Sequence, residues 1–580
     1  MLRGQGSISK RGLLAAAAFL GAALLLPQPA EAQFSQVSAA ALVNRPASND
    51  IRAASEHPSA CANADAVVFE SGIDDLVGND TNGARDVFLS ADGTLSGVNL
   101  STAGALSAAG AGSPSVSAKS TSGEFAVAFV SMSADIVPGY APPSMSQNTQ
   151  VYLRVFPSGK TVLISRAASG AAQGAIGSAT QPVVSIIPGV PTRYKVAFLS
   201  TARNMAPGGS AVGTVWPYLA TVEMKGGSPV VTSVATLPIE PNDNIADVAL
   251  SGDGNSVAFS TAATNLAGGN VTTGGRQHVY LWTVPPVAPP SGSEIEMISR
   301  SASGDPGLGT SLRPSLSFQG DVQTFITRAA NILPDANSDR PAVALRRSGS
   351  STTTQANATA DGQPSGGFVT DQQISPSGIY VVFSDTGNVV GTPTNFSQAY
   401  IKNVLTGEVA LVSRLADGSP ANGDCGEVSV GAAAFNAAKT FVSFSSVAQN
   451  LTDVALNDNP AIFRTSVVSA PPPLSDQLPL NAPPDIKVKE RNIVLLLQGF
   501  KASGAAPSGA LTQATRIRYR TVVQKTTGRR ERILRITTRN QVTIRRLSPG
   551  RYTVRYRVTG TTSSGNISTR FSPKQPFKIV

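Results

Sequence analysis

The chain has 580 residues, more than a single hydrophobic core usually serves, so we expect at least two domains. Aromatic residues make up 6% of it and charged residues 14%, with 54 Gly and 40 Pro, a composition that favours many short strands joined by turns and argues against a helical fold. The net charge of +10 hides a division, because residues 485–580 hold 21 Lys+Arg against 3 Asp+Glu, whereas residues 33–484 hold 22 against 32. An acidic body therefore precedes a basic C-terminal region.

Residues 1–32 have the pattern of a secretory signal peptide. Basic residues are followed by an apolar run from Leu13 to Leu26 and by the small-residue triplet Ala30-Glu31-Ala32, which predicts cleavage before Gln33. The run is shorter than the roughly 20 residues of a membrane span, and a retained N-terminal anchor is the alternative. We therefore expect an exported protein, periplasmic or secreted.

One stretch recurs through most of the chain. It is an apolar strand with a central Phe, such as VAFSTAATN from Val257, preceded by a turn such as Gly252-Asp253-Gly254. Because the run is apolar throughout rather than alternating, we predict a strand covered on both faces. The central residues, 58 to 69 positions apart, are Phe69, Phe129, Phe198, Phe259, Phe325, Phe383 and Phe444. Each repeat is long enough for one four-stranded sheet.

An Asp or Asn followed by an apolar residue stands beyond each Phe. The six copies with the same spacing are Asp75, Asp135, Asn204, Asn265, Asn331 and Asn450, and Asn388 comes one residue early. A short acceptor that satisfies its own turn backbone explains this recurrence, and a repeated metal or substrate contact is the alternative.

Two further strand motifs complete the unit, HVYL from His278 and MISR from Met297 being one example. With the turn, the Phe strand and the Asx-apolar pair in this order, the unit resembles the WD40-like, TolB-type β-propeller repeat of bacterial envelope proteins. The resemblance spans nearly all of residues 33–470. It implies an all-β fold in which residues 33–469 form a seven-bladed β-propeller.

The seventh unit runs into proline where its last strand should come. Near the N-terminus, Leu42-Val43-Asn44-Arg45 reads like a stray LVSR strand. We expect this segment to complete the seventh blade and close the ring, since closure removes exposed sheet edges; a disordered leader is the alternative. The two cysteines, Cys61 and Cys425, would then lie on adjacent blades, and we predict a disulfide between them unless geometry forbids it.

Residues 470–484 are rich in proline and predict a semi-rigid linker. Residues 485–580 then read as strands. Leu547-Ser548-Pro549-Gly550-Arg551-Tyr552 resembles the corner motif of fibronectin type III domains, which implies a β-sandwich.

Strand alternation in this C-terminal region predicts an exposed arginine ladder on two neighbouring strands. A solubilising face, or docking on the acidic propeller, competes with contact to an external anion, for which the planar guanidinium is suited. The candidate anion-binding residues are Arg516, Arg518, Arg520, Arg555 and Arg557.

Catalytic signals are weak. The chain has two histidines, and His57 and His278 both occupy positions that favour a structural role. There is no GxSxG motif and no His/Cys metal cluster, so we predict no metal or other cofactor. A calcium loop is the exception considered, with Asp80, Asn82 and Asp86 as weak ligands, because the segment departs from EF-hand spacing and a turn explains it.

The function predicted from the sequence is therefore a non-enzymatic, exported propeller that binds or scaffolds in the bacterial cell envelope. Its partner would be a protein or an anionic envelope polymer, with nucleic acid the weaker candidate. The alternative is a hydrolase or lyase that acts on polysaccharide or peptide with carboxylates as acid and base.

Overall fold

The structure is a computed structural model of the chain. Side chains are described only within residues 34–469, and beyond them only the backbone of strands. The described residues are 34–62, 65–120, 122–140, 148–168, 174–187, 192–205, 214–266, 273–284, 295–337, 339–392, 394–432 and 440–469, followed by 485–489, 492–496, 516–525, 532–537, 541–544, 550–562, 565–568 and 575–579. The predicted signal peptide and linker lie outside them.

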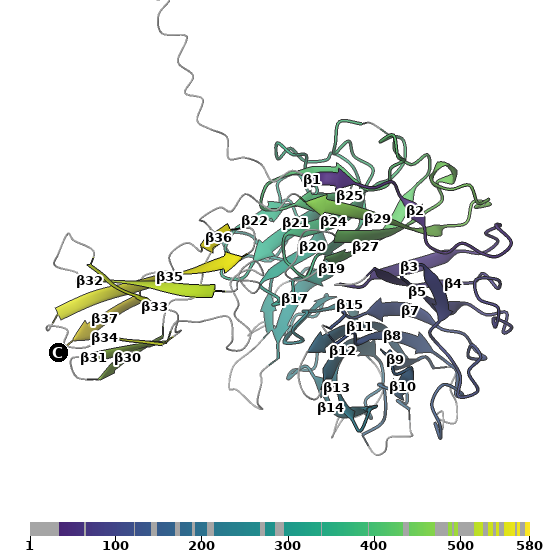
Figure 1. Ribbon diagram of the computed structural model, residues 1–580, viewed down its shortest axis with the longest axis horizontal. Coiled ribbons are helices and arrows are strands. Elements are labelled where there is room, and N and C mark those ends of the chain that lie inside the picture. The colour runs from purple at the N-terminus through teal and green to yellow at the C-terminus, as the bar shows by residue number, and fades with distance from the viewer. Residues whose placement is uncertain are drawn as a thin grey trace, which may run out of the picture.

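Seven antiparallel sheets follow one another around a ring, which makes the body a seven-bladed β-propeller as predicted (Figure 1). Blades 1 to 3 are β3(Ser55–Ala60), β4(Ala66–Ser71), β5(Asp86–Ala91), β6(Thr94–Gly97); β7(Gly112–Val116), β8(Phe125–Ser131), β9(Gln150–Phe156), β10(Lys160–Leu163); and β11(Ala179–Ile187), β12(Arg193–Ser200), β13(Trp216–Lys225), β14(Ser228–Thr236).

Blades 4 to 6 have the same order. They are β15(Ile245–Leu250), β16(Ser256–Thr261), β17(His278–Thr283), β18(Ile295–Met297); β19(Ser311–Leu316), β20(Val322–Thr327), β21(Ala342–Arg347), β22(Thr353–Gln355); and β23(Val369–Ile374), β24(Tyr380–Asp385), β25(Gln398–Asn403), β26(Val409–Leu411). The first strand of each blade is its inner strand, and neighbouring inner strands contact one another around the ring.

Blade 7 is built from both ends of the propeller chain. It contains β27(Cys425–Ala432), β28(Thr440–Ser446) and β29(Ala461–Ser469), and the N-terminal strands β1(Phe34–Val37) and β2(Ala41–Leu42) pair with β29. Asn44, which is fully buried, strengthens this closure, since its Nδ2 donates to Ser55 Oγ at 2.8 Å and its Oδ1 accepts from Ile462 N at 2.9 Å. The ring therefore closes through segments more than 400 residues apart.

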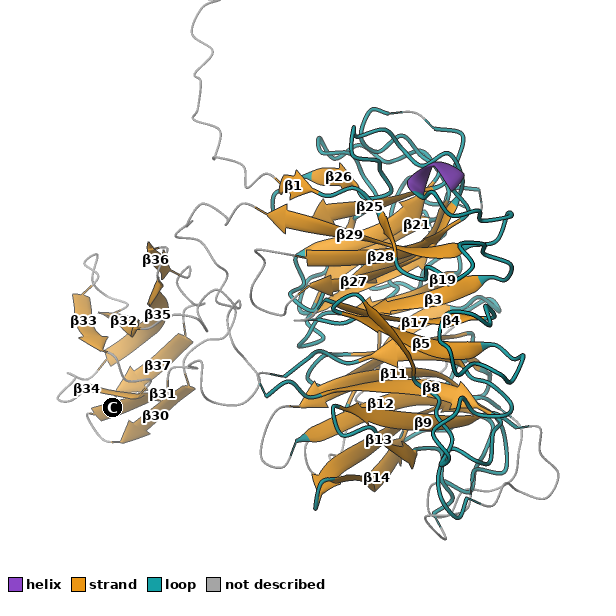
Figure 2. Cartoon of the chain, turned by 45° about the vertical axis from the view of Figure 1, so that its right-hand side comes forward, coloured by secondary structure: helices purple, strands orange, loops and turns teal. Residues whose placement is uncertain are grey.

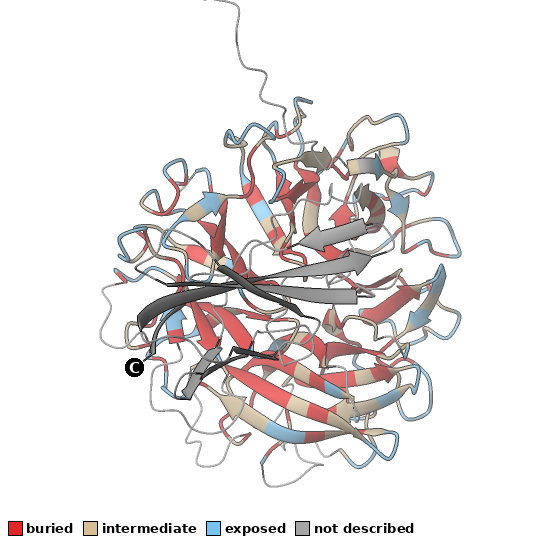
Figure 3. Ribbon diagram, turned by 60° about the vertical axis from the view of Figure 1, so that its left-hand side comes forward, coloured by how far each residue is buried: buried red, intermediate tan, exposed pale blue. Residues whose placement is uncertain are grey.

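The predicted Phe strands are the second strands of the blades and are buried on both faces (Figure 3). In six blades the Phe pairs with an aromatic residue of the third strand, with ring centroids 5.6 to 5.9 Å apart. In blade 5 Phe325 instead faces Ala344. Such cross-strand aromatic pairs add to the free energy gained by burial alone.

Other described elements are few. Among the described residues the only helical segment is the 3₁₀ turn η1(Gln449–Leu451), and no helix there is long and apolar enough to cross a membrane (Figure 2).

The C-terminal region has two sets of paired strands. One set contains β30(Asp485–Lys489), β31(Asn492–Leu496) and β34(Gln541–Ile544), and the other contains β32(Arg516–Lys525), β33(Arg532–Thr537), β35(Gly550–Thr562), β36(Gly565–Ser568) and β37(Gln575–Ile579). The fibronectin type III assignment stays a prediction, since half of its corner motif, residues 547–549, falls outside the described residues.

We expect Phe259→Leu to destabilise the protein more than Phe325→Leu does, by roughly 0.5–1.5 kcal/mol. Both side chains are fully buried at the same strand position, but only Phe259 stacks on an aromatic ring, that of Tyr280. Denaturant midpoints of the two variants measure the difference. Equal losses would show that the stacks contribute no more than burial.

Candidate functional site

Every inner strand contains a β-bulge or register irregularity close to the end of the ring at which the inner strands begin, here called the entry end. In four blades the bulged residue precedes proline and has a positive φ near 50°; these residues are His57, Ser113, Gln181 and Arg313. Proline has no N–H to give to a ladder, so a bulge is the place where an inner strand tolerates it. The motifs HPSAC, SPSVS, QPVVS and RPSLS thus mark bulges.

Backbone N–H groups that the bulges leave out of the strand pairing donate hydrogen bonds to carboxylates of the preceding blade. His57 N donates to Glu427 Oε2 at 2.5 Å, and Ser113 N to Glu70 Oε2 at 2.6 Å. In the same way Arg313 N donates to Asp247 Oδ2 at 3.0 Å, and Val428 N to Asp371 Oδ2 at 2.9 Å. Four junctions between described blades are therefore fastened by acidic side chains at the entry end.

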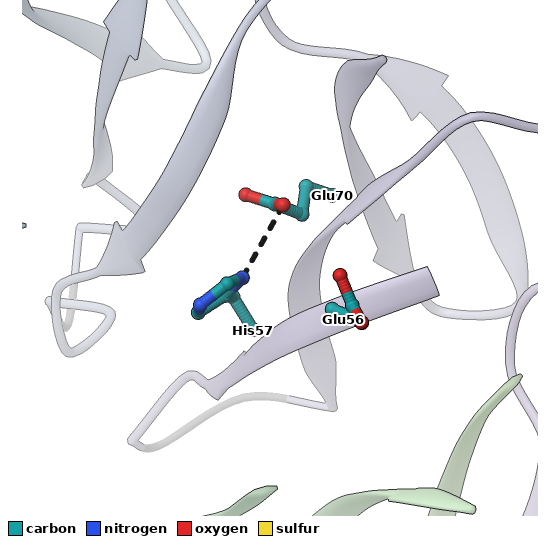
Figure 4. Close-up of side chains that lie close together, drawn as sticks. All are labelled: Glu56, His57 and Glu70. Carbon is teal, nitrogen blue, oxygen red and sulfur yellow. Dashed lines mark ion pairs between the residues drawn. The ribbon is translucent and has the colours of Figure 1, made fainter. Parts of the chain in front are cut away.

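The densest cluster of charge lies where blade 7 meets blade 1. His57 Nδ1 is 3.3 Å from Glu70 Oε1, and His57 Nε2 is 3.2 Å from Glu427 Oε1. Arg85 Nη1 reaches Glu56 at 2.5 Å and Glu70 at 2.7 Å. Figure 4 shows His57 and Glu70 directed toward each other with Glu56 beside them. We call these five residues the His57 cluster.

The His57 cluster is charged at neutral pH. Its hydrogen bond with Glu70 raises the pKa of His57 to about 9, although burial opposes the shift. Burial alone would raise the pKa of Glu70, but bonds from His57, Ser113 and Arg85 lower it to about 2. Burial also raises the pKa of Glu427, and the charge of His57 opposes this. An imidazolium therefore bridges two carboxylates across the closing junction.

Metal binding does not fit the His57 cluster well. Glu56, His57 and Glu70 place ligand atoms within 4.8 Å of one another, but a metal needs neutral imidazole, and Arg85 already supplies a cation to both carboxylates. General acid–base chemistry meets a similar obstacle, since Glu70 and the imidazolium are held in their charged forms by each other. The geometry is that of a group of ion pairs that holds blade 7 against blade 1.

Two of the residues that the sequence suggested as weak calcium ligands have structural partners. Of the weak calcium ligands, Asn82 Nδ2 donates to Asp86 Oδ1 at 3.1 Å and to Ser107 O at 2.8 Å. Gln150 and Gln398 make the corresponding bond to the next blade's loop, through Nε2 to Ala175 O and Ala421 O. Asn82 and Asp86 together thus replace one glutamine of the repeat, while Asp80 Oδ1 and Asp86 Oδ2 are buried without a hydrogen-bond partner.

The Asx residues of the repeat have a structural partner, though not the predicted one. The six with the same spacing accept a backbone N–H from the loop entering their own blade, 23 to 28 residues upstream, rather than from their own turn. In blade 6, where Asn388 comes one residue early, the loop N–H of Phe368 donates to Thr386 instead. Examples are Ile176 N to Asn204, Leu308 N to Asn331 and Asn422 N to Asn450, at 2.8 to 3.0 Å. Asn331 and Asn450 also donate to Pro306 O and Pro420 O.

The predicted Cys61–Cys425 disulfide is absent from the structure, and both thiols are free and buried. Cys61 Sγ contacts Ser117 O, and Cys425 Sγ contacts Ser446 Oγ. A Cβ on Gly431 would meet Cys61 O at 2.4 Å, so Cys61 lies beside Gly431, six residues along β27 from Cys425. Six residues of strand span about 20 Å, far beyond the reach of a disulfide.

His278 has a buried structural position. It is fully buried at the start of β17, where its Nδ1 is 3.4 Å from Ser299 Oγ and burial lowers its pKa. Sequence reasoning missed the His57 cluster, because the segments that form it are up to 370 residues apart. The arginines of the predicted ladder lie on paired strands, with Arg520 opposite Arg557 in the β32–β35 register.

No family model matches the chain, and no curated protein matches it. Solved structures resemble it at low identity. A Mycobacterium tuberculosis puromycin-hydrolyzing peptidase shares 11% identity at a TM-score of 0.38, over 82% of this chain and 63% of the peptidase. A Trypanosoma rangeli sialidase in complex with sialic acid shares 9% at 0.30, over 84% and 86%, and a Dyadobacter fermentans protein of unknown function shares 14% at 0.31, over 62% and 95%. At such values the likenesses carry no argument about activity.

We expect the stability difference between wild type and His57→Gln to be fully present below pH 6.5 and to disappear as the pH rises through about 9, because the pKa of His57 is raised from 6.5 to about 9 on folding. Glutamine suits the bulge, since Gln181 occupies the same position in blade 3. The difference should be about 1 kcal/mol, because the imidazole is 48% exposed and solvent screens the pair.

Denaturant unfolding of both proteins between about pH 6 and pH 10 tests this expectation, and groups common to both cancel in the difference. A difference that does not change with pH would contradict the charged bridge.

Proposed function

We propose that the chain is an exported, non-enzymatic β-propeller that binds or scaffolds a protein or an anionic polymer of the bacterial cell envelope. The observation that carries the proposal is the use of the entry-end carboxylates. Glu70, Glu427, Asp247 and Asp371 each accept a backbone N–H of the next blade, so they hold the ring together rather than stand ready as acid and base. The TolB-type repeat and the signal-peptide pattern support an envelope location.

The basic C-terminal region is proposed as the attachment module. Its 21 Lys+Arg against 3 Asp+Glu exceed what solubility requires. The β32–β35 register pairs Arg520 with Arg557 and Val522 with Arg555, which brings the arginine-bearing segments of two strands together. The planar fork of a guanidinium binds carboxylate and phosphate groups through two parallel hydrogen bonds, which suits arginine for contact with an anionic polymer.

We expect the full chain to bind immobilised polygalacturonate or dextran sulfate at about 50 mM salt and to be released at about 500 mM. Arg555→Glu with Arg557→Glu should weaken binding at least about tenfold, because four units of charge change within the row. Arg193→Glu with Arg340→Glu makes the same charge change at exposed propeller positions and should have little effect. Quantitative co-sedimentation measures all three proteins.

Binding to neutral dextran, or equal weakening by both pairs of substitutions, would refute attachment through the C-terminal arginines. Double-stranded DNA, added as a soluble competitor, tests the nucleic-acid alternative. If DNA displaces the protein from the immobilised polymer at a lower concentration than soluble polysaccharide does, nucleic acid is the preferred anion. Hydrolysis of the polysaccharide during the assay would support the enzymatic alternative.

A further inference from the structure

A cavity of about 370 Å³ lies in the wall between blades 4 and 5. Blade 4 contributes residues from Glu296 to Gly304, and blade 5 contributes Arg346 to Ser351 from the end of β21 and the turn after it. In blade 5, Ser311 pairs with Thr327 at the entry end, and Val322 pairs with Arg347 at the opposite end. The cavity lies at this opposite end and is therefore distant from the His57 cluster. Its volume is in the range of small-molecule sites.

Positive charge dominates the lining of this cavity. Arg300, Arg346 and Arg347 belong to the lining together with one acidic residue, Glu296. Arg346 lies on the same face of β21 as Ala344, toward blade 4, whereas Arg347 follows Leu345 on the face toward blade 6. Arg300 already pairs with Glu296. Among the described residues, neither Arg346 nor Arg347 forms an ion pair. Arg346 therefore has no carboxylate in direct contact, although the charge of Glu296 acts on it from a greater distance.

The buried position of Arg346 makes its positive charge unfavourable for the stability of the folded protein. Its side chain is only 4% exposed, and its Nη1 donates to two neutral acceptors, Arg300 O at 3.1 Å and Thr353 Oγ1 at 3.4 Å. Burial lowers the pKa of Arg346 and of Arg347. A buried cation that lacks a counter-charge destabilises a protein unless an anion is supplied from elsewhere.

Hydroxyl groups and open backbone surround the arginines. Ser301, Ser303, Ser348, Ser350 and Ser351 line the cavity. Gly304 and Gly349 have φ values of 96° and 76°, and no atom lies within 4 Å of the place where a Cβ would stand. A ligand's oxyanion can thus meet guanidinium groups while its hydroxyls meet serines.

We propose that this cavity binds an anionic saccharide unit, a sugar that carries a phosphate or carboxylate group, with Arg346 holding the oxyanion and the serines holding the sugar hydroxyls. The site is separate from the C-terminal arginines, so the proposal goes beyond the polymer attachment argued above. It assigns a second, pocket-type binding site to the propeller itself.

The full chain would be titrated with α-D-glucose 1-phosphate, galacturonate, inorganic phosphate and glucose by isothermal calorimetry. We expect saturable binding of the first two, weaker binding of phosphate and none of glucose. Arg346→Gln should weaken the tightest ligand at least about tenfold, since a charge-assisted hydrogen bond is lost. Arg346→Lys keeps the charge at this buried position and is the decisive variant if Arg346→Gln fails to fold; it should also weaken binding, because an ammonium lacks the planar fork of a guanidinium.

Arg154→Gln is the matched control. Arg154 occupies the same strand position in blade 2, and its Nη1 donates to Thr161 Oγ1 at 3.1 Å as Arg346 does to Thr353, but it does not line the cavity. Binding should survive both this substitution and Arg555→Glu with Arg557→Glu, which separates the cavity from the C-terminal region. Absence of saturable binding below about 10 mM, or equal weakening by Arg154→Gln and Arg346→Gln, would overturn the proposal. Phosphate binding as tightly as glucose 1-phosphate would refute the role of the serines.

Discussion

The fold depends on how each inner strand is fastened to the next. A single four-stranded blade cannot bury its own faces, so stability comes from contacts between neighbours and from closure of the ring. The bulges of the inner strands turn N–H groups toward the adjacent blade, where Glu427, Glu70, Asp247 and Asp371 accept them. Serines of the same strands add a second row of bonds, for example Val116 N to Ser59 Oγ at 3.2 Å.

This fastening explains why charge at the entry end is poor evidence for catalysis. Glu70 already accepts hydrogen bonds from Ser113 N, His57 and Arg85, which lower its pKa and occupy its lone pairs. Acidic residues around a propeller axis can be required by the ring itself. Surfaces at which the blades differ from one another are better places to look for ligands.

The sequence was sufficient for the blades and insufficient for the contacts between them. Seven Phe strands could be counted because each is a local pattern, and their burial on both faces followed from their apolar runs. The His57 cluster could not be found, since Glu427 and His57 meet only after the ring closes. The disulfide prediction was wrong for a related reason, because residues on adjacent blades can lie at opposite ends of their strands. Cys61 directly follows the end of β3, and Cys425 begins β27.

A basic residue near the end of the third strand shows how one position of the repeat acquires different roles. In blade 7 this position holds the uncharged Thr465, whose hydroxyl donates to Val412 O at 2.8 Å. In blade 6 Lys402 reaches only carbonyl oxygens, at 2.7 and 3.1 Å, and burial lowers its pKa to about 8, so it can lose its charge at mildly alkaline pH. Arg346 in blade 5 has neither solution, because a guanidinium stays protonated and no described carboxylate pairs with it. An anion from solution is the remaining means of balance, and the cavity beside Arg346 provides the space for it.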